Sequence, residues 1–126
     1  MLTKSQENLS VEFDSAFKNI NKKESSIQTD YCIVNVLNGG NKFGFIHAEN
    51  KRIYVDKYSP EKLNLWRKSV CETIAAPHSK TIDSNNYMVL SRNVQFGETQ
   101  FECVVCLGRK EKDGSRTFIT GYFKDE

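Results

Sequence analysis

The sequence has few of the features that mark extreme classes of protein. Among its 126 residues there are only two prolines, Pro60 and Pro77, while charged residues make up 27% and hydrophobic residues 38%. This balance excludes a collagen-like chain, a disulfide-dense small scaffold and a fully disordered chain. No apolar run approaches the roughly 20 residues of a bilayer span, and the first residues lack the apolar core of a signal peptide. We therefore expect one soluble domain over residues 1–126, with no membrane partner.

The four cysteines are too few, and too unevenly spaced, to indicate a disulfide framework or a zinc finger. Cys103 and Cys106 form a CxxC, but they lie in QFECVVCLG, a run typical of a strand. Residues three apart on a strand point to opposite faces, so the two thiols do not converge on one metal ion. We expect four free thiols in a reducing, cytoplasmic compartment, with no metal and no cofactor.

Familiar catalytic motifs are also missing: there is no Walker loop, no GxGxxG, no HExxH and no GxSxG. The net charge is only +2, but the basic residues are unevenly distributed. Residues 31–80 carry four acidic side chains and twice as many basic ones, which are Lys42, Lys51, Arg52, Lys57, Lys62, Arg67, Lys68 and Lys80. This middle third either presents a positive field to a polyanion or is simply a solvated, lysine-rich face.

The first half of the chain is predicted to contain a helix and a hairpin. Leu9, Phe13, Phe17 and Ile20 recur at helical spacing, which predicts an amphipathic helix over residues 3–22. A polar linker follows at 22–29. Beyond it we expect strands at 31–37, 42–47 and 52–56, the first two joined by a glycine and asparagine turn at 38–41.

The second half begins with the clearest local signal. Ser59 can cap a helix, Pro60 fits its first position, and Pro77 ends it. Strands are expected at 79–83, 87–94, 99–108 and 116–123. The sum is an α+β domain with two helices packed on one face of an antiparallel, meandering sheet, divided into a helix and linker at 1–29 and a core at 30–126.

A few scattered residues are candidates for chemistry on RNA. Histidine is a residue type that can exchange a proton with a ribose 2′-hydroxyl or a leaving oxygen, which makes His47 a candidate for this chemistry. Fixed cations would have to hold the phosphate, and Arg52, Lys80 and Arg92 are the plausible ones. The plainer interpretation of His47 is a hydrogen-bonded residue at the end of a strand.

The last predicted strand, RTFITGYF, offers two hydroxyl groups. Alternation places Ile119 and Phe123 on one face, and Phe118, Thr120 and Tyr122 on the other. If the first face meets the helices, Thr120 and Tyr122 lie together on the open face, where they can bind a phosphate oxygen and stack a base. The alternative is a half-buried strand made of ordinary β-formers.

The order of these elements resembles the ribonuclease superfamily that groups barnase, EndoU, colicin-type tRNases and the RelE toxins, especially its phage-encoded and polymorphic-toxin branches. The resemblance covers about residues 43–123 and rests on His47 upstream, a helix ending at Pro77, and a closing ITGY at 119–122. It implies metal-independent cleavage of RNA by attack of the ribose 2′-hydroxyl on the adjacent phosphate. It also implies an immunity or antitoxin protein as partner, and delivery into a target cell as part of a larger protein.

The leading hypothesis is therefore an endoribonuclease, with tRNA as one candidate substrate. His47, Arg52, Thr120 and Tyr122 would form its catalytic site, and Lys51, Arg67, Lys80 and Arg92 would bind the RNA phosphates. The second hypothesis is a module without catalytic activity that binds nucleic acid or a partner protein through residues 52–68. An immunity protein is a third possibility, although such proteins are normally acidic.

Overall fold

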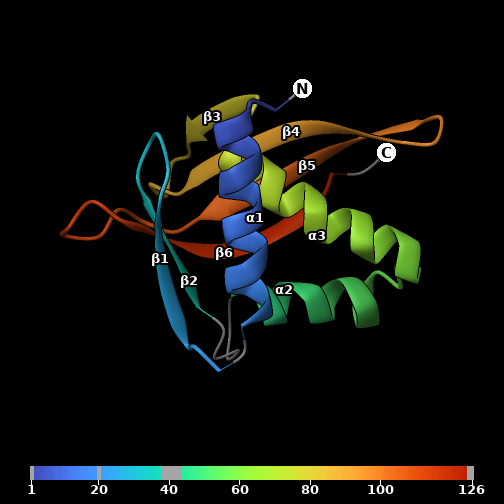
Figure 1. Cartoon of the computed structure of the whole chain (residues 1–126), viewed down its shortest axis with the longest axis horizontal. Coiled ribbons are helices and arrows are strands. Elements are labelled where there is room, and N and C mark those ends of the chain that lie inside the picture. Colours follow the sequence, from blue (N-terminus) through green and yellow to red (C-terminus); the bar gives the residue numbers. More distant parts are fainter. Residues whose placement is uncertain (1, 20, 38–43, 125–126) are drawn as a thin grey trace.

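The structure, a computed structural model, describes residues 2–19, 21–37 and 44–124. These residues form three α-helices, a π-helical segment and six strands, which is the α+β class expected from the sequence, with one more helix than the two predicted (Figure 1). The helices are α1 (Lys4–Lys18), α2 (Phe45–Asn50), η1 (Lys51–Val55, the π-helical segment) and α3 (Pro60–Ala75). The strands are β1 (Glu24–Gln28), β2 (Ile33–Leu37), β3 (Ser79–Ile82), β4 (Met88–Phe96), β5 (Thr99–Leu107) and β6 (Arg116–Phe123).

The two long helices begin at side-chain caps. The hydroxyl of Thr3 accepts a hydrogen bond from the Gln6 backbone N–H, and the Gln6 side chain accepts one from the Thr3 N–H in return. Ser59 accepts one from the Lys62 N–H, as its position before Pro60 predicts. None of the helices in the described ranges is both long enough and apolar enough to cross a membrane.

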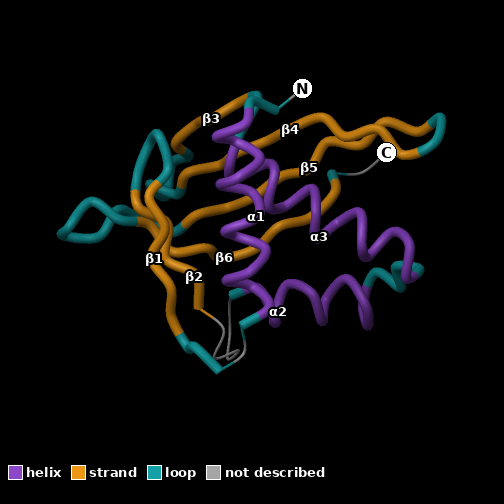
Figure 2. The backbone as a smooth tube through the Cα atoms, viewed as in Figure 1, coloured by secondary structure: helices purple, strands orange, loops and turns teal. Residues whose placement is uncertain are grey.

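The six strands form one sheet in the order β1-β2-β6-β5-β4-β3 (Figure 2). The meander from β3 to β6 is antiparallel, as expected, whereas β2 and β6 pair in parallel at Val34↔Arg116 and Asn35↔Thr117. Three helical segments and three strands separate β2 from β6 in the chain, and so long a connection permits parallel pairing.

The core lies between one face of this sheet and the helices. Phe17 of α1 stacks on Phe45 of α2 with ring centroids 4.0 Å apart, and Phe45 lies 5.2 Å from the Trp66 ring of α3. The Phe118 ring of β6 is 5.2 Å from that of Phe17 and 6.2 Å from that of Phe45, so α1 and α2 meet the sheet through aromatic contacts and α3 joins them through Trp66. Burial of each of these side chains contributes on the order of 2–3 kcal/mol to stability.

Two of the predicted strands are helical instead. Phe45, Ile46 and His47 lie in α2, and most of the predicted strand at 52–56 lies in η1; Lys42, Phe43 and the predicted turn at 38–41 are outside the described residues. Phe45 and Ala48 are buried, and so is Arg52, at a spacing of three and four residues. The β-branched residues around Tyr54 favour a strand locally, but packing of this helical stripe against β6 overrides that preference.

The predicted polar linker at 22–29 contains β1. This strand pairs with β2 from Glu24↔Leu37 to Gln28↔Ile33. Among its five residues only Ile27 is buried, so its sequence shows no alternation of apolar and polar side chains. The partner strand, rather than a local pattern, therefore determines its conformation.

Candidate nucleic-acid interface

Among the described residues, no strand pairs with the second half of β6 on the side away from β5. β2 pairs with β6 only as far as Thr117, and beyond it the segment from Gly44 to Tyr58 covers the open edge. The Gly44 N–H donates to the Ile119 carbonyl at 3.2 Å. The Gly121 carbonyl accepts two side-chain donors, Arg52 Nη1 at 2.9 Å and Trp66 Nε1 at 3.0 Å. Helical segments thus satisfy the backbone groups that an edge strand leaves unpaired.

Arg52 forms the central contact of this edge. Its side chain is 9% exposed, and its Nε lies 2.8 Å from Asp56 Oδ2. This contact is an ion pair without the angle of a hydrogen bond, because Nε has no hydrogen-bond acceptor among the described residues. The guanidinium predicted to hold a substrate phosphate therefore faces the protein interior and binds η1 to β6.

The outer surface of α2 and η1, unlike the buried side that carries Arg52, exposes apolar and basic side chains to solvent. Tyr54 and Val55 are large hydrophobic residues that are 68% and 69% exposed. The exposed lysines Lys51 and Lys57 flank them in sequence, and neither forms an ion pair with any residue that the structure describes. Half-buried His47 lies one turn before Lys51. We call these five residues the Tyr54 face.

Thr120 and Tyr122 lie on the face of the sheet away from the helices. They pair with Cys106 and Val104, whereas Gly121 between them faces α3, where a Cβ atom would stand 2.8 Å from Val70 Cγ2. The two hydroxyls share the open face as expected. Burial raises the pKa of Tyr122, and the charge of Arg52 opposes that rise.

Phe118 was expected beside Thr120 and Tyr122 but packs in the core. The register between β5 and β6 shifts by one residue next to Leu107, which pairs with Phe118, while Cys106 pairs with Thr120. Ile119 is the additional residue of this bulge, so Phe118 faces the helices together with Gly121 and Phe123. Simple alternation fails at a bulge because one strand contributes two residues opposite one.

Lys80 and Arg92 lie at the other end of α3. Arg92 Nη1 donates to the Ala76 carbonyl at 2.7 Å, where a cation complements the negative end of the helix dipole. Lys80 Nζ lies 5.2 Å from the centroid of the Tyr31 ring. Ala76 follows Trp66, the neighbour of Arg52 at Gly121, by about 15 Å along the helix axis. The structure therefore does not bring these two cations to the Tyr54 face.

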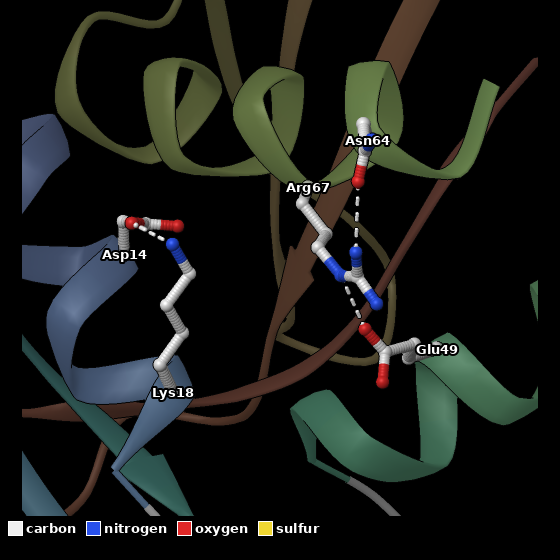
Figure 3. Close-up of polar contacts among 5 residues, drawn as sticks. All are labelled: Asp14, Lys18, Glu49, Asn64 and Arg67. Carbon is white, nitrogen blue, oxygen red and sulfur yellow. Dashed lines mark hydrogen bonds and ion pairs between the residues drawn. The ribbon is translucent and has the colours of Figure 1, made fainter. Parts of the chain in front are cut away.

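Arg67 is held between helices. Its Nε contacts a Glu49 carboxylate oxygen of α2, and its Nη1 donates to Asn64 Oδ1 at 3.0 Å (Figure 3). It also lines a groove of about 540 Å³ between α1 and α3, where Lys18 pairs with Asp14 at 2.8 Å. The charged side chains of that groove are three acids and three bases, namely Glu7, Asp14, Glu72, Lys18, Arg67 and Lys68. It has no net charge with which to attract a polyanion.

Of the eight predicted site residues, His47 and Lys51 lie one turn apart on the helical segment that also carries exposed Tyr54, and exposed Lys57 follows that segment. The sequence did not single out Tyr54 or Lys57 as site residues. The sequence signal for this surface was the adjacent pair Tyr54–Val55 between two lysines, but the same pair is equally typical of a strand. The described residues hold no group of three His, Cys, Asp or Glu side chains able to bind a metal ion. Comparisons with protein-family models, curated proteins and solved structures find no match to this chain.

Proposed function

We propose that this chain is a binding module that recognises single-stranded RNA through the Tyr54 face. The observation that carries the proposal is the exposure of the Tyr54 ring between two lysines that have no ion-pair partner among the described residues. A soluble domain gains nothing in stability from an aromatic ring held in water, so a ring in this position is available to a ligand.

The chemistry of this face suits unpaired nucleotides. A base can stack on the Tyr54 ring, and the ammonium groups of Lys51 and Lys57 can neutralise the phosphates on either side of it. Stacking needs a base whose face is free, which a duplex does not offer. His47 adds a hydrogen-bonding group one turn from Lys51, within the same helical surface.

Charge favours a polyanion over a protein partner at this site. Neither exposed lysine forms an ion pair with a described residue, whereas the nearby acids Glu49 and Asp56 pair with Arg67 and Arg52. The Tyr54 face therefore carries a net positive charge, and this is the footprint expected of a surface that attracts phosphates.

Cleavage of RNA, implied by the ribonuclease resemblance, stays a prediction. Arg52 is committed to Gly121 and Asp56, and Lys80 and Arg92 lie beyond the far end of α3. The proposal of RNA binding uses only the Tyr54 face, so it does not require the predicted catalytic residues to lie close together. A tRNA is one RNA whose unpaired loops would suit this face.

The test is fluorescence anisotropy with a labelled, unstructured RNA of about twelve nucleotides. Tyr54→Ala should weaken binding by about 1–3 kcal/mol, or roughly 5- to 150-fold in Kd, with little change in stability because the ring is exposed. Phe96→Ala, which removes another exposed aromatic ring at the end of β4, is the matched control and should bind as the wild type does. Equal affinities for wild type and Tyr54→Ala would contradict the proposal.

The same mixtures, kept in chelator and resolved on a gel, test cleavage. Products ending in a 2′,3′-cyclic phosphate that disappear with His47→Ala would support the ribonuclease hypothesis. Intact RNA after long incubation with the wild type would favour binding alone.

A further inference from the structure

The π-helical turn that presents Tyr54 contains an ion pair between buried Arg52 and exposed Asp56. The Asp56 N–H donates to the Lys51 carbonyl at 3.0 Å, which closes the five-residue turn, and the Tyr58 N–H donates to the Arg52 carbonyl at 3.0 Å. Inside this turn the Arg52 guanidinium bridges the Asp56 carboxylate and the Gly121 carbonyl of β6. The Arg52 side chain thus attaches the turn to β6, and just after the turn the Tyr58 ring stacks on Phe123 of the same strand.

The backbone after the turn is strained. Lys57 has φ +56°, a left-handed conformation that costs a side-chain-bearing residue about 1 kcal/mol or more. A strained residue persists when its neighbours fix the backbone on both sides. Here Asp56 precedes Lys57 and Tyr58 follows it, and both are tied to η1. Breaking the pair would thus loosen the segment that carries Tyr54 and Lys57.

We infer that Arg52 and Asp56 are positioning residues: their ion pair sets the Tyr54 face in the geometry that receives RNA, and neither contacts the RNA. This inference rests on the proposed function. It assigns to Arg52, a cation in the basic middle of the chain, a role other than binding phosphate.

A positioning role for the ion pair and a purely electrostatic role for Asp56 predict opposite effects of Asp56→Asn on RNA affinity. Asp56→Asn removes a negative charge beside an RNA-binding surface, and on electrostatics alone that change tightens binding. If the pair positions the face, the same change loosens the turn and weakens binding by about two- to tenfold, the lower part of the usual range of coupling between residues in contact. Asp56 is 38% exposed, so its substitution is far less disruptive than that of buried Arg52.

The experiment measures RNA affinity against salt concentration for the wild type, Asp56→Asn and Glu61→Gln. Glu61 is an exposed acid in the first turn of α3, so its variant removes the same charge without touching Arg52. We expect weaker binding for Asp56→Asn with an unchanged salt dependence, and equal or tighter binding for Glu61→Gln. Tighter binding by Asp56→Asn, with a salt slope steeper by about 0.7, would mean that freed Arg52 binds a phosphate and would overturn the inference.

Amide hydrogen exchange separates this inference from the proposed function. In Asp56→Asn the N–H groups of residue 56 and Tyr58 should exchange faster, because the turn they close has loosened. Unchanged exchange would refute the positioning role even if RNA binds. Failure of the wild type to bind RNA would refute the proposed function, while the exchange rates would still decide whether the pair holds the turn.

Discussion

The packing of β6 against the helices depends on a few residues, such as Arg52 and Gly121, whose contact partners are distant in sequence. Arg52 was predicted to bind phosphate because a cation in a basic stretch normally faces solvent. Its burial depends on the Gly121 carbonyl, 69 residues away, which no local pattern reveals. The opposite orientations of Cys103 and Cys106 were predicted correctly, because alternation on a strand is a local property.

Gly121 is the residue at which this packing is tightest. A Cβ atom there would lie 2.8 Å from Val70 Cγ2 of α3 and 3.5 Å from Val105 Cγ2 of β5. We expect Gly121→Ala to lower the free energy of unfolding by about 1–3 kcal/mol through overpacking. Urea denaturation measures the change. Gly108→Ala, whose Cβ would meet the end of the Ile119 side chain at 3.4 Å, is the milder control; equal losses would contradict this explanation.

Elements were predictable where their own sequence carries the signal. α3 follows from Ser59, Pro60 and a clear apolar stripe, and its start at Pro60 matches the prediction. The segment from Phe45 to Val55 was assigned to strands, since its β-formers outweigh a helical stripe of only three residues. β1 was missed for a different reason: with one buried side chain, its sequence shows no alternation of apolar and polar residues. The conformations of the segment from Phe45 to Val55 and of β1 are therefore determined by their packing partners, β6 and β2, rather than by their own sequences.

The cap of α3 provides the test at this scale. Ser59→Ala removes the acceptor for the Lys62 N–H and should cost about 1 kcal/mol of stability. Ser5→Ala, an exposed serine inside the first turn of α1, should be neutral or slightly stabilising, since alanine is the better helix former. Chemical denaturation of both variants measures the difference. A Ser59→Ala protein as stable as the wild type would show that the cap contributes nothing.

At the scale of the whole molecule, the α+β class was predictable because helical and strand periods differ along the chain. The parallel contact between β2 and β6 was not, since it joins segments about eighty residues apart and is fixed only by folding. The separation of the predicted site residues has the same origin. His47 and Lys51 lie on the Tyr54 face, Thr120 and Tyr122 lie on the open face of the sheet, and Lys80 and Arg92 lie at the end of α3. Arg52 is buried against β6, and Arg67 lies between α2 and α3.

The buried acids of the core predict how stability depends on pH. Burial raises the pKa of the Cys103 thiol to about 12, and it raises the pKa values of Cys71 and Tyr31 as well. Above the ordinary thiol pKa of 9.0 the unfolded chain loses protons that the folded chain retains. The free energy of unfolding should therefore fall between pH 9 and 12, by up to about 1.4 kcal/mol per pH unit for each group.

Urea denaturation at pH 8 and pH 10 measures this loss. Cys103→Ala should reduce the difference between the two pH values, because one of the buried acids is gone. A wild-type protein equally stable at both, or a variant with the same pH dependence, would show that these thiols ionise alike in the folded and unfolded chains.

The most direct measurement of RNA recognition is photocrosslinking with a single-stranded RNA that carries 4-thiouridine, followed by trypsin digestion and mass spectrometry. Cleavage after Arg52 and Lys57 releases residues 53–57, the peptide that contains Tyr54. We predict that this peptide carries the main crosslink and that excess unlabelled RNA removes it. Crosslinks confined to peptides from the sheet or the end of α3, or none at all, would contradict recognition of RNA by the Tyr54 face.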